Sequence, residues 1–479
     1  MMRRMRTDHT LQLLSPPRRT KTPRSVIGPG VSPEQVIAAW PASAPLAALT
    51  GGSTTHAPAI PGSGARWSIL ARPTDSARGY PSAIDAIANS IRPVQPPDDI
   101  PFTGGWIGWI AYEAGAHIEP TTRRPSPPKQ ESDWPDACFL RCPGAFVYDA
   151  QARQWWTVGD SQILPALDWE QADGALSGDA HACDVGPLVS SAGRDRYIRD
   201  AASVIELIHA GDAFQVNLAH HLSAPFRGDA RRCFLDLIRS ASPWFGAYIE
   251  RPDGLGAICS LSPELFLKAD LTTRAVSTRP IKGTRPDSSD EAELLGSAKD
   301  SAELAMIVDL MRNDLGRVCQ FGSVRVTDPK TIERHASASP DRTTGVLHGV
   351  ATIKGLLRED VGLRELLDAT FPPGSVTGAP KVRAMQIINE FEPLPRGPYC
   401  GAIGFVSDSG SVELSVAIRT ASILGHRPDP ARLGVFDGRI SFPVGAGLVA
   451  DSQPEAEWRE TLDKAAAFVV AMNGAMTTR

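Results

Sequence analysis

Two kinds of apolar periodicity occur in an irregular order along this chain, and that order constrains the fold more than any other feature. Between 195 and 211 the apolar residues recur at the spacing of one helical face, whereas over 412–419 they fall on every second position, as in a half-buried strand. Further helices are expected over 291–314, 361–369, 381–391 and 454–472, and further strands over 145–147, 155–158, 213–218, 257–260, 265–268 and 439–443. Because no regular strand–helix–strand rhythm joins these segments, the pattern favours an antiparallel α+β fold over a parallel α/β fold.

Composition excludes several classes of protein. The chain has 479 residues, with 49 basic and 54 acidic side chains and a formal net charge of −5. A chain that binds nucleic acid over its whole surface is normally basic, so no nucleic-acid partner is expected. No segment approaches the ~18 consecutive apolar residues of a membrane span, so no membrane partner is expected either. The 42 glycines and 41 prolines predict many turns between short elements.

The chain divides into three predicted regions. Residues 1–30 carry seven Arg or Lys and one acid, and we interpret them as a disordered basic tail. A Gly-, Asp- and Ala-rich stretch over 171–190 separates an N-terminal region, 31–185, from a second region, 190–475. The seven cysteines are scattered without metal-binding spacing, which is typical of a reduced, cytoplasmic protein with buried thiols.

A glycine-rich segment, Gly445–Ala450, follows a predicted strand and precedes the last predicted helix. Its pattern resembles a dinucleotide-binding turn, but no second strand follows to carry a ribose-binding acid. We therefore interpret it as a glycine turn whose backbone N–H groups are open to an anionic ligand.

Carboxylates recur at helical spacing in two places. Glu303 follows Asp300 by three residues, and Glu460 follows Glu457 by three, so each pair shares a helix face. Such pairs are usually solvated; if they bind a metal, oxygen ligands without nearby His or Cys suit Mg²⁺.

Lys282 stands between an apolar residue and Gly283-Thr284, in the segment Pro280–Pro286. We interpret this as a tight, partly buried turn. Burial lowers the pKa of a lysine and makes its amine a nucleophile, whereas the alternative is an ordinary surface lysine.

Taken together, the ordered motifs resemble the chorismate-utilising enzymes, most closely aminodeoxychorismate synthase component I. These motifs are Leu261–Phe266, Pro280–Pro286, Ile307–Arg317, Gly374–Met385, Tyr399–Gly404, Ile418–Thr420 and Val444–Ser452, followed by Glu457 and Glu460. The resemblance is strong over about 190–475 and weaker in the N-terminal third, where Phe102–Trp106 carries it. It implies an anthranilate-synthase-like α+β composite of two layered antiparallel sheets with surrounding helices.

The same resemblance implies the site. Glu303 and Glu460 would hold Mg²⁺ with Glu457 beside the ion, and the ion would clamp the ring carboxylate of chorismate. The residues that would line the substrate site are Gly283, Thr284, Tyr399, Arg419, Gly445, Ala446 and Gly447. His348 matches a family histidine near the ring, although Ala336–Gly345 resembles an insertion before it.

Two positions indicate which reaction the family resemblance implies. Anthranilate synthases typically carry alanine where this chain has Lys282, whereas in the aminating enzymes a lysine there attacks C2 of chorismate. Glu264 would be the general acid–base. Isochorismate and salicylate synthases carry a water-activating lysine where this chain has Gln215, and a neutral amide cannot be that base.

The expected reaction is amination of chorismate to 4-amino-4-deoxychorismate, in the folate and p-aminobenzoate pathway, through a covalent lysine intermediate. No Gly-x-Cys-x-Gly glutaminase motif surrounds any cysteine, so ammonia is expected from a separate glutamine amidotransferase subunit. The alternatives are anthranilate synthase component I and a catalytically silent chorismate-binding subunit. Tryptophan binding near Leu49–Ser53 is left open.

Overall fold

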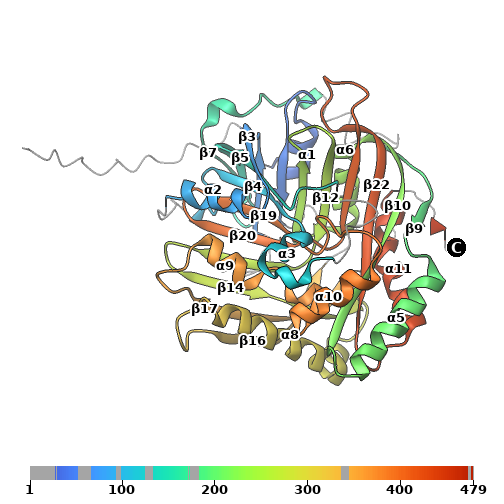
Figure 1. Cartoon of the computed structure of the whole chain (residues 1–479). Coiled ribbons are helices and arrows are strands. Elements are labelled where there is room, and N and C mark those ends of the chain that lie inside the picture. Colours follow the sequence, from blue (N-terminus) through green and yellow to red (C-terminus); the bar gives the residue numbers. More distant parts are fainter. Residues whose placement is uncertain are drawn as a thin grey trace, which may run out of the picture.

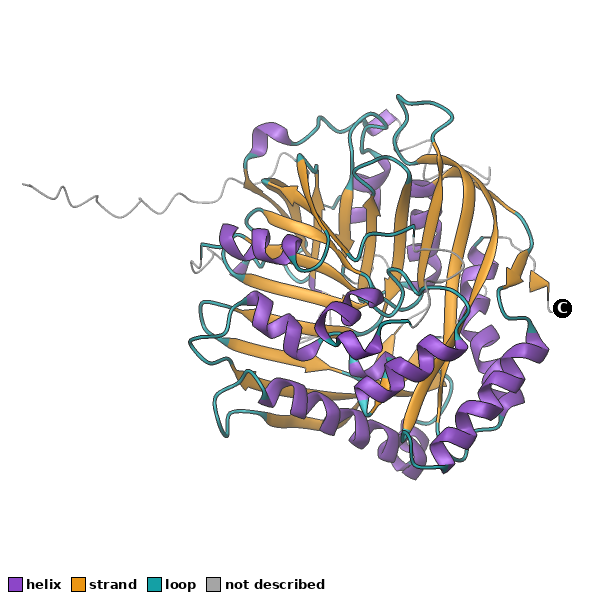
Figure 2. Cartoon of the chain, viewed as in Figure 1, coloured by secondary structure: helices purple, strands orange, loops and turns teal. Residues whose placement is uncertain are grey.

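The fold consists of two antiparallel sheets packed face to face, with helices on their outer faces (Figure 1 and Figure 2). The computed structural model describes residues 27–28, 30–51, 66–92, 99–124, 133–170, 172, 183–335, 345–472 and 476–477. The expected tail therefore lies almost wholly outside the described residues, as do 336–344 of the expected insertion. The predicted fold class is confirmed.

Within the described residues the first sheet has 13 strands. In spatial order they are β23 (Met476–Thr477), β9 (Leu188–Ser190), β10 (Gln215–Asp229), β22 (Val435–Leu448), β21 (Thr420–His426), β12 (Gly256–Ser262), β11 (Phe245–Glu250), β1 (Ala47–Thr50), β2 (Trp67–Ala71), β6 (Gly144–Asp149) and β7 (Gln154–Gly159), while β18 (Gly378–Ala379) and β8 (Cys183–Val185) also pair with β10. The β6–β7 pair was expected from the sequence and is confirmed.

The second sheet has 10 strands in the part of the chain that the structure describes. Their order is β15 (Ile281–Pro286), β17 (Val346–Leu356), β14 (Ala275–Arg279), β13 (Leu265–Asp270), β20 (Ser411–Val416), β19 (Ala402–Ser407), β4 (Gly105–Ile110), β5 (Ala137–Cys142) and β3 (Asp75–Arg78), with β16 (Arg325–His335) paired to β17. Strands of the predicted N-terminal region, 31–185, and of the second region, 190–475, thus share both sheets.

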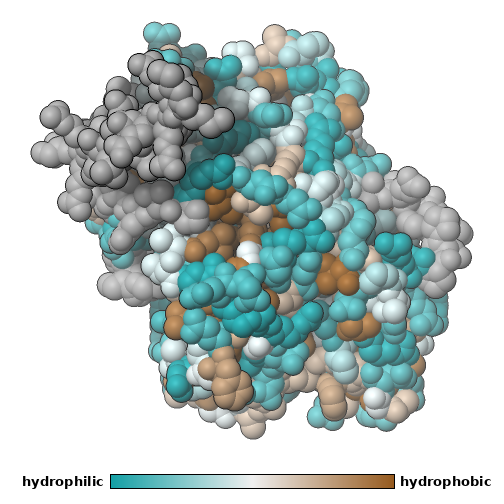
Figure 3. All heavy atoms as spheres, turned by 60° about the vertical axis from the view of Figure 1, so that its left-hand side comes forward, coloured by the Kyte–Doolittle hydropathy of each residue, from teal (hydrophilic) through white to brown (hydrophobic). Residues whose placement is uncertain are grey.

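Apolar side chains between the two sheets form a buried core that includes Ile69, Trp109, Ile258 and Phe405. The helices cover the other faces: α1 (Pro33–Ala38), α2 (Ser82–Ser90), α3 (Gly115–Ile118), α5 (Arg194–His209), α6 (Ala230–Ala241), α7 (Glu291–Gly296), α8 (Ala298–Gly316), α9 (Leu363–Thr370), α10 (Lys381–Phe391) and α11 (Pro454–Ala471). No helix within the described residues is both long and apolar enough to cross a membrane. The face shown in Figure 3 is mostly hydrophilic, with small scattered apolar groups.

Local capping residues explain where α1 and α8 begin. Ser32 caps α1 with a reciprocal capping box to Gln35, as its position before Pro33 predicts. One expected helix is two: the segment 291–314 breaks at Ser297, whose extended backbone ends α7 and whose hydroxyl accepts a hydrogen bond from the Asp300 N–H at the start of α8. All seven cysteine thiols are free, and all but Cys183 are buried.

The long β10–β22 ladder departs most from the sequence prediction. The strand expected over 213–218 runs on to Asp229, and the expected glycine turn over 445–450 is strand up to Leu448. The two strands pair from Val216–Leu448 to Asp229–Val435. The turn interpretation was wrong because β10 supplies the neighbour that holds these glycines extended.

Candidate active site

Lys282 lies in β15, opposite Gly349 of β17. The predicted tight turn is instead a β-bulge: Gly283 has a φ of +80°, and the register with β17 shifts between Lys282 and Thr284. A Cβ on Gly447 would lie 3.4 Å from the Lys282 Nζ. The bulge therefore directs the Lys282 amine toward the glycine segment of β22.

Burial lowers the pKa of Lys282 below its usual 10.5. The nearby Lys464 ammonium acts in the same direction. The carboxylates of Glu303, Glu264 and Glu460 oppose the shift but do not cancel it. The amine therefore loses its proton more readily than that of an exposed lysine.

The segment Gly445–Gly447 forms a strand edge next to this amine. The β21–β22 ladder ends at the pair Ser422–Ser441, and beyond it β22 pairs only with β10 among the described strands. The Lys464 Nζ donates a hydrogen bond to the Gly445 carbonyl at 2.8 Å. The open backbone groups expected from a turn are thus provided by a strand edge.

Two amide side chains of β10 face the same region. Gln215 is fully buried, and neither its Nε2 nor its Oε1 has a hydrogen-bond partner among the described residues. Asn217 is 8% exposed, and its Nδ2 is likewise unpaired. The sequence analysis used Gln215 only to exclude water addition and overlooked Asn217, although their alternate positions on a predicted strand place both on one face.

Glu264 follows β12 and is 3% exposed. Burial raises its pKa to about 7, although the positive charge of Lys282 opposes the shift. Its Oε1 has no hydrogen-bond partner in the described part of the chain. A carboxyl group that titrates near neutrality can both donate and accept a proton, which is what a general acid–base requires.

His348 lies directly across from Thr284 in the β15–β17 ladder, and its Nδ1 is 2.9 Å from the Thr284 Oγ1. The ring is 2% exposed, and its Nε2 has no hydrogen-bond partner among the residues described. The ring of His335 meets it edge-on, with centroids 4.8 Å apart. Burial, aided by the charge of Arg419, lowers the pKa of His348 well below 6.5, so the imidazole is neutral.

Arg419 has a left-handed backbone, with φ of +51°, between β20 and β21. Burial lowers its pKa, and within the described residues its guanidinium makes no ion pair. Tyr399 is 5% exposed, and the guanidinium carbon of Arg396 lies 6.0 Å from the centroid of the Tyr399 ring. The half-buried Arg419 guanidinium, which has no counterion among the described residues, is suited to binding an anionic ligand.

Three predicted acidic residues come from two helices. Glu303 of α8 and Glu460 of α11 both raise the pKa of Lys282 through their negative charges. The two carboxylates therefore act on the same amine although they come from different helices. The Lys464 Nζ is 2.7 Å from a Glu460 carboxylate oxygen, and the Lys299 Nζ is 3.9 Å from a Glu303 one. Burial raises the pKa of Glu457, and so does Glu460, although Ser452 donates a hydrogen bond to Glu457 at 2.7 Å.

These acids suit an ion that needs few protein ligands. In the described residues no three or more His, Cys, Asp or Glu side chains form a metal-binding group. Mg²⁺ commonly keeps several waters and binds through one or two carboxylates plus oxygens of its substrate. Glu303 of α8 and Glu460 of α11, which both act on the Lys282 amine, offer only oxygen donors, and such donors suit Mg²⁺ better than zinc.

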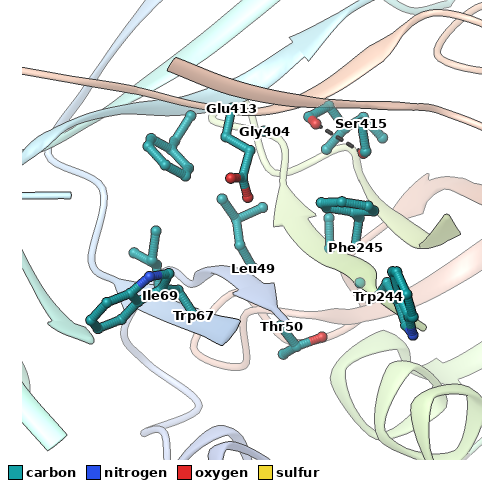
Figure 4. A pocket seen from close by; sticks show the side chains of 13 residues that line it. Leu49, Thr50, Trp67, Ile69, Trp244, Phe245, Gly404, Glu413 and Ser415 are labelled. Carbon is teal, nitrogen blue, oxygen red and sulfur yellow. Dashed lines mark hydrogen bonds between the residues drawn. The ribbon is translucent and has the colours of Figure 1, made fainter. Parts of the chain in front are cut away.

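A separate small pocket lies between the two sheets (Figure 4). Leu49, Thr50 and Trp67 line it from the first sheet, and Phe405 and Glu413 from the second. Its volume of about 30 Å³ has room for roughly two waters. Part of the segment considered for tryptophan thus lines a real pocket, while 52–53 lie outside the described residues.

Comparison with known proteins identifies the family of this chain. Residues 53–470 match the family described as chorismate binding enzyme. Aminodeoxychorismate synthase component 1 of Escherichia coli is 37% identical over 381 residues, which cover 77% of this chain and 76% of that protein. Anthranilate synthase component 1 of Synechocystis is 35% identical over 437 residues, covering 83% and 82%.

The solved structure of anthranilate synthase component I from Streptococcus pneumoniae superposes with a TM-score of 0.66 at 27% identity, covering 86% of this chain and 94% of that one. The shared two-sheet fold and the family match over 53–470 lead to one conclusion. This chain belongs to the chorismate-binding enzymes.

Proposed function

We propose that the chain aminates chorismate to 4-amino-4-deoxychorismate through a covalent bond to Lys282. The observation that supports this most is the buried Lys282 amine, directed at the glycine segment of β22, with its pKa lowered. Relatives of the aminating and anthranilate-forming kinds match at 37% and 35% identity, so identity alone does not separate the two reactions. Lysine at this position favours amination, since an anthranilate-forming reaction needs no amine here.

In the first step the neutral Lys282 amine attacks C2 of chorismate. The two ring double bonds shift, the bond from C4 to its hydroxyl breaks, and Glu264 transfers the proton lost by the lysine nitrogen to the departing oxygen, which leaves as water. In the second step ammonia attacks C4, the double bonds shift back, and the bond from C2 to the lysine nitrogen breaks. A proton from the new ammonium group returns to the lysine, so chorismate and ammonia become the amino product and water.

The remaining residues bind and orient the substrate. Arg419 supplies an unpaired cation for a carboxylate, and the neutral His348 and Thr284 border the ring. Glu303 and Glu460, with Glu457 beside them, would hold Mg²⁺, whose contribution is to neutralise the ring carboxylate. The glycines of β22 leave room for the ring next to Lys282.

Ammonia is proposed to come from a separate glutamine amidotransferase subunit. The designation "component 1" of the aminating relatives implies a second component in those proteins. The chain alone is expected to use ammonium but not glutamine, and added amidotransferase subunit should confer glutamine use. Glutamine-dependent turnover by the pure chain would refute the two-subunit arrangement.

The test is product analysis with chorismate, MgCl₂ and ammonium, alongside intact-protein mass without ammonium. Wild type should give aminodeoxychorismate and a lysine-linked adduct. Lys282→Ala and Lys282→Arg should lose the adduct and at least about a thousandfold in kcat/KM, because neither offers a neutral amine. Lys354→Ala, a change of an exposed lysine on β17, is the matched control and should behave like wild type. Anthranilate as product would establish the alternative reaction, and binding without any product would establish a silent subunit.

A further inference from the structure

The side chain of Asn217 is an unused polar group beside the glycine segment of β22. It lies in β10 directly opposite Gly447 and is 8% exposed. Its Nδ2 has no hydrogen-bond partner among the described residues. An unpaired buried donor destabilises a folded protein, so such a group at the edge of a site points to an acceptor on a ligand.

The backbone of Asn217 is firmly held. Its N–H donates to the Thr377 carbonyl at 2.9 Å, and its carbonyl accepts a hydrogen bond from Arg396 at 2.6 Å. The strand position of the residue is therefore set by contacts on both sides. The side-chain amide donor, in contrast, has no partner among the described residues.

The amide faces the proposed substrate site. Gln215 and Asn217 are two residues apart on one strand, so their side chains share a face. A Cβ on Gly447 would lie 2.8 Å from the Gln215 Nε2 and 3.4 Å from the Lys282 Nζ, and a Cβ on Gly445 would lie 3.1 Å from the Asn217 Nδ2. The Asn217 donor thus borders the same glycine-lined space as the amine, one step further along β22.

Within the described residues, no anionic side chain accepts a hydrogen bond from that donor. A charged group, Lys464, lies beside this part of β22: its Nζ donates a hydrogen bond to the Gly445 carbonyl at 2.8 Å and pairs with Glu460 at 2.7 Å. The Asn217 Nδ2 and the Lys464 Nζ both lie next to Gly445, and no acceptor among the described residues bonds the Nδ2. An oxygen of a small anionic molecule would fill this role.

We propose that Asn217 is a further substrate-binding residue, whose Nδ2 donates a hydrogen bond to a carboxylate or hydroxyl oxygen of bound chorismate. This inference rests on the proposed function, since it takes chorismate as the ligand. Asn217 acts through binding and orientation and takes no part in bond making.

The test compares affinity with stability in the same samples. Chorismate binding is measured by calorimetry with MgCl₂ and without ammonia, and urea unfolding is measured without chorismate. Asn217→Leu keeps the size but removes the donor, so affinity should fall roughly tenfold while the urea midpoint stays the same or rises. Asn217→Asp should bind more weakly still, because its carboxylate repels the substrate's.

Asn389→Leu on α10 is the matched control. The Asn389 amide already donates to the Thr122 carbonyl, so this change should lower the urea midpoint and leave chorismate affinity unchanged. We therefore expect Asn217→Leu to lose chorismate affinity without losing stability, and Asn389→Leu to lose stability without losing affinity.

Failure of this inference is distinguishable from failure of the proposed function. If wild type does not bind chorismate, the proposed function is wrong. If wild type binds and Asn217→Leu binds equally well, or loses affinity only in proportion to lost stability, the role of Asn217 is refuted. If Asn217→Leu does not fold, the test uses Asn217→Asp instead. Chorismate affinity equal to wild type in Asn217→Asp then refutes the inference.

Discussion

Two buried polar regions lie next to each other along β10. In one the polar side chains are hydrogen-bonded to each other and to the backbone, whereas in the other several buried polar atoms have no partner among the described residues. In the first, which we term the ion network (Glu113, Glu392 and Arg396), Arg396 is 2% exposed and all three of its guanidinium nitrogens are bonded. Glu392 also accepts the Ala219 N–H at 2.9 Å, and Glu113 accepts the Arg396 N–H at 2.7 Å. In the second, the proposed active site, the Gln215, Asn217, Glu264 and His348 side chains each retain an unpaired buried atom.

Burial explains why this difference is informative. A buried polar group without a partner is destabilising, so a chain that can bond such groups internally does so, as in the ion network. Asn217 links the two regions: its carbonyl accepts a hydrogen bond from Arg396, whereas its side-chain Nδ2 borders Gly445 and has no partner among the described residues. We infer that the unpaired groups are complementary to a ligand and that the paired groups hold the wall behind it.

The largest effect on stability is expected in the ion network. Arg396→Met leaves the Glu392 carboxylate buried without its cation and should lower the free energy of unfolding by about 3–5 kcal/mol. Urea unfolding at pH 7 measures this. Arg312→Met is the control, because Arg312 is 51% exposed in its pair with Asp309, and its loss should cost less than about 1 kcal/mol. Similar small losses in both variants would mean that the network is not structural.

A smaller, pH-dependent effect is expected at Glu264. Its folded-state pKa of about 7 lies above the usual 4.5, so between these values the folded protein binds more protons than the unfolded chain. Wild type therefore loses stability as pH rises through this window. Glu264→Gln cannot ionise and should gain roughly 3 kcal/mol relative to wild type between pH 4 and pH 8.

The measurement is the difference in unfolding free energy between Glu264→Gln and wild type across that pH range, with the exposed Glu359→Gln as control. Amination should fall roughly 10²–10⁴-fold in the Glu264 variant, as for loss of a general acid–base. A flat stability difference would show that the Glu264 carboxyl is not desolvated.

The smallest change in stability is expected at Gln215. Gln215→Leu removes two unpaired buried atoms and should leave the unfolding free energy unchanged or raise it by about 1 kcal/mol. Amination should nevertheless decrease, because the amide faces Lys282. Thermal and urea unfolding, together with product analysis, check both parts. A clear loss of stability would mean that Gln215 is bonded like the ion network, and the contrast between the two regions would disappear.

The elements with strong local signals could be predicted from sequence. The apolar spacing of α5 and α10 and the Ser-Pro start of α1 are written in adjacent residues, and the structure confirms these helices. The end of β22 could not be predicted, because Gly445 and Gly447 favour turns locally and become extended only through pairing with β10. The break at Ser297 was likewise hidden within one continuous apolar pattern.

Some residues of the candidate site could likewise be predicted from sequence, and others could not. Lys282, Glu264 and Arg419 occur in short motifs, so the family resemblance was enough to identify them as candidates. Whether Gln215 and Asn217 have hydrogen-bond partners depends on which side chains distant segments place near them. The sequence around these two residues does not contain that information. Lys464 could have been noticed, since it follows Glu460 by four residues on the same helix face.

The shared sheets also bear on how this chain can be inherited. A gene fragment starting near residue 190 would retain β11 and β19 but lose β1 and β4, the strands that cover one side of each. Two bare strand edges would then be available for pairing with other molecules. The first third of the chain and the remainder must therefore be inherited together.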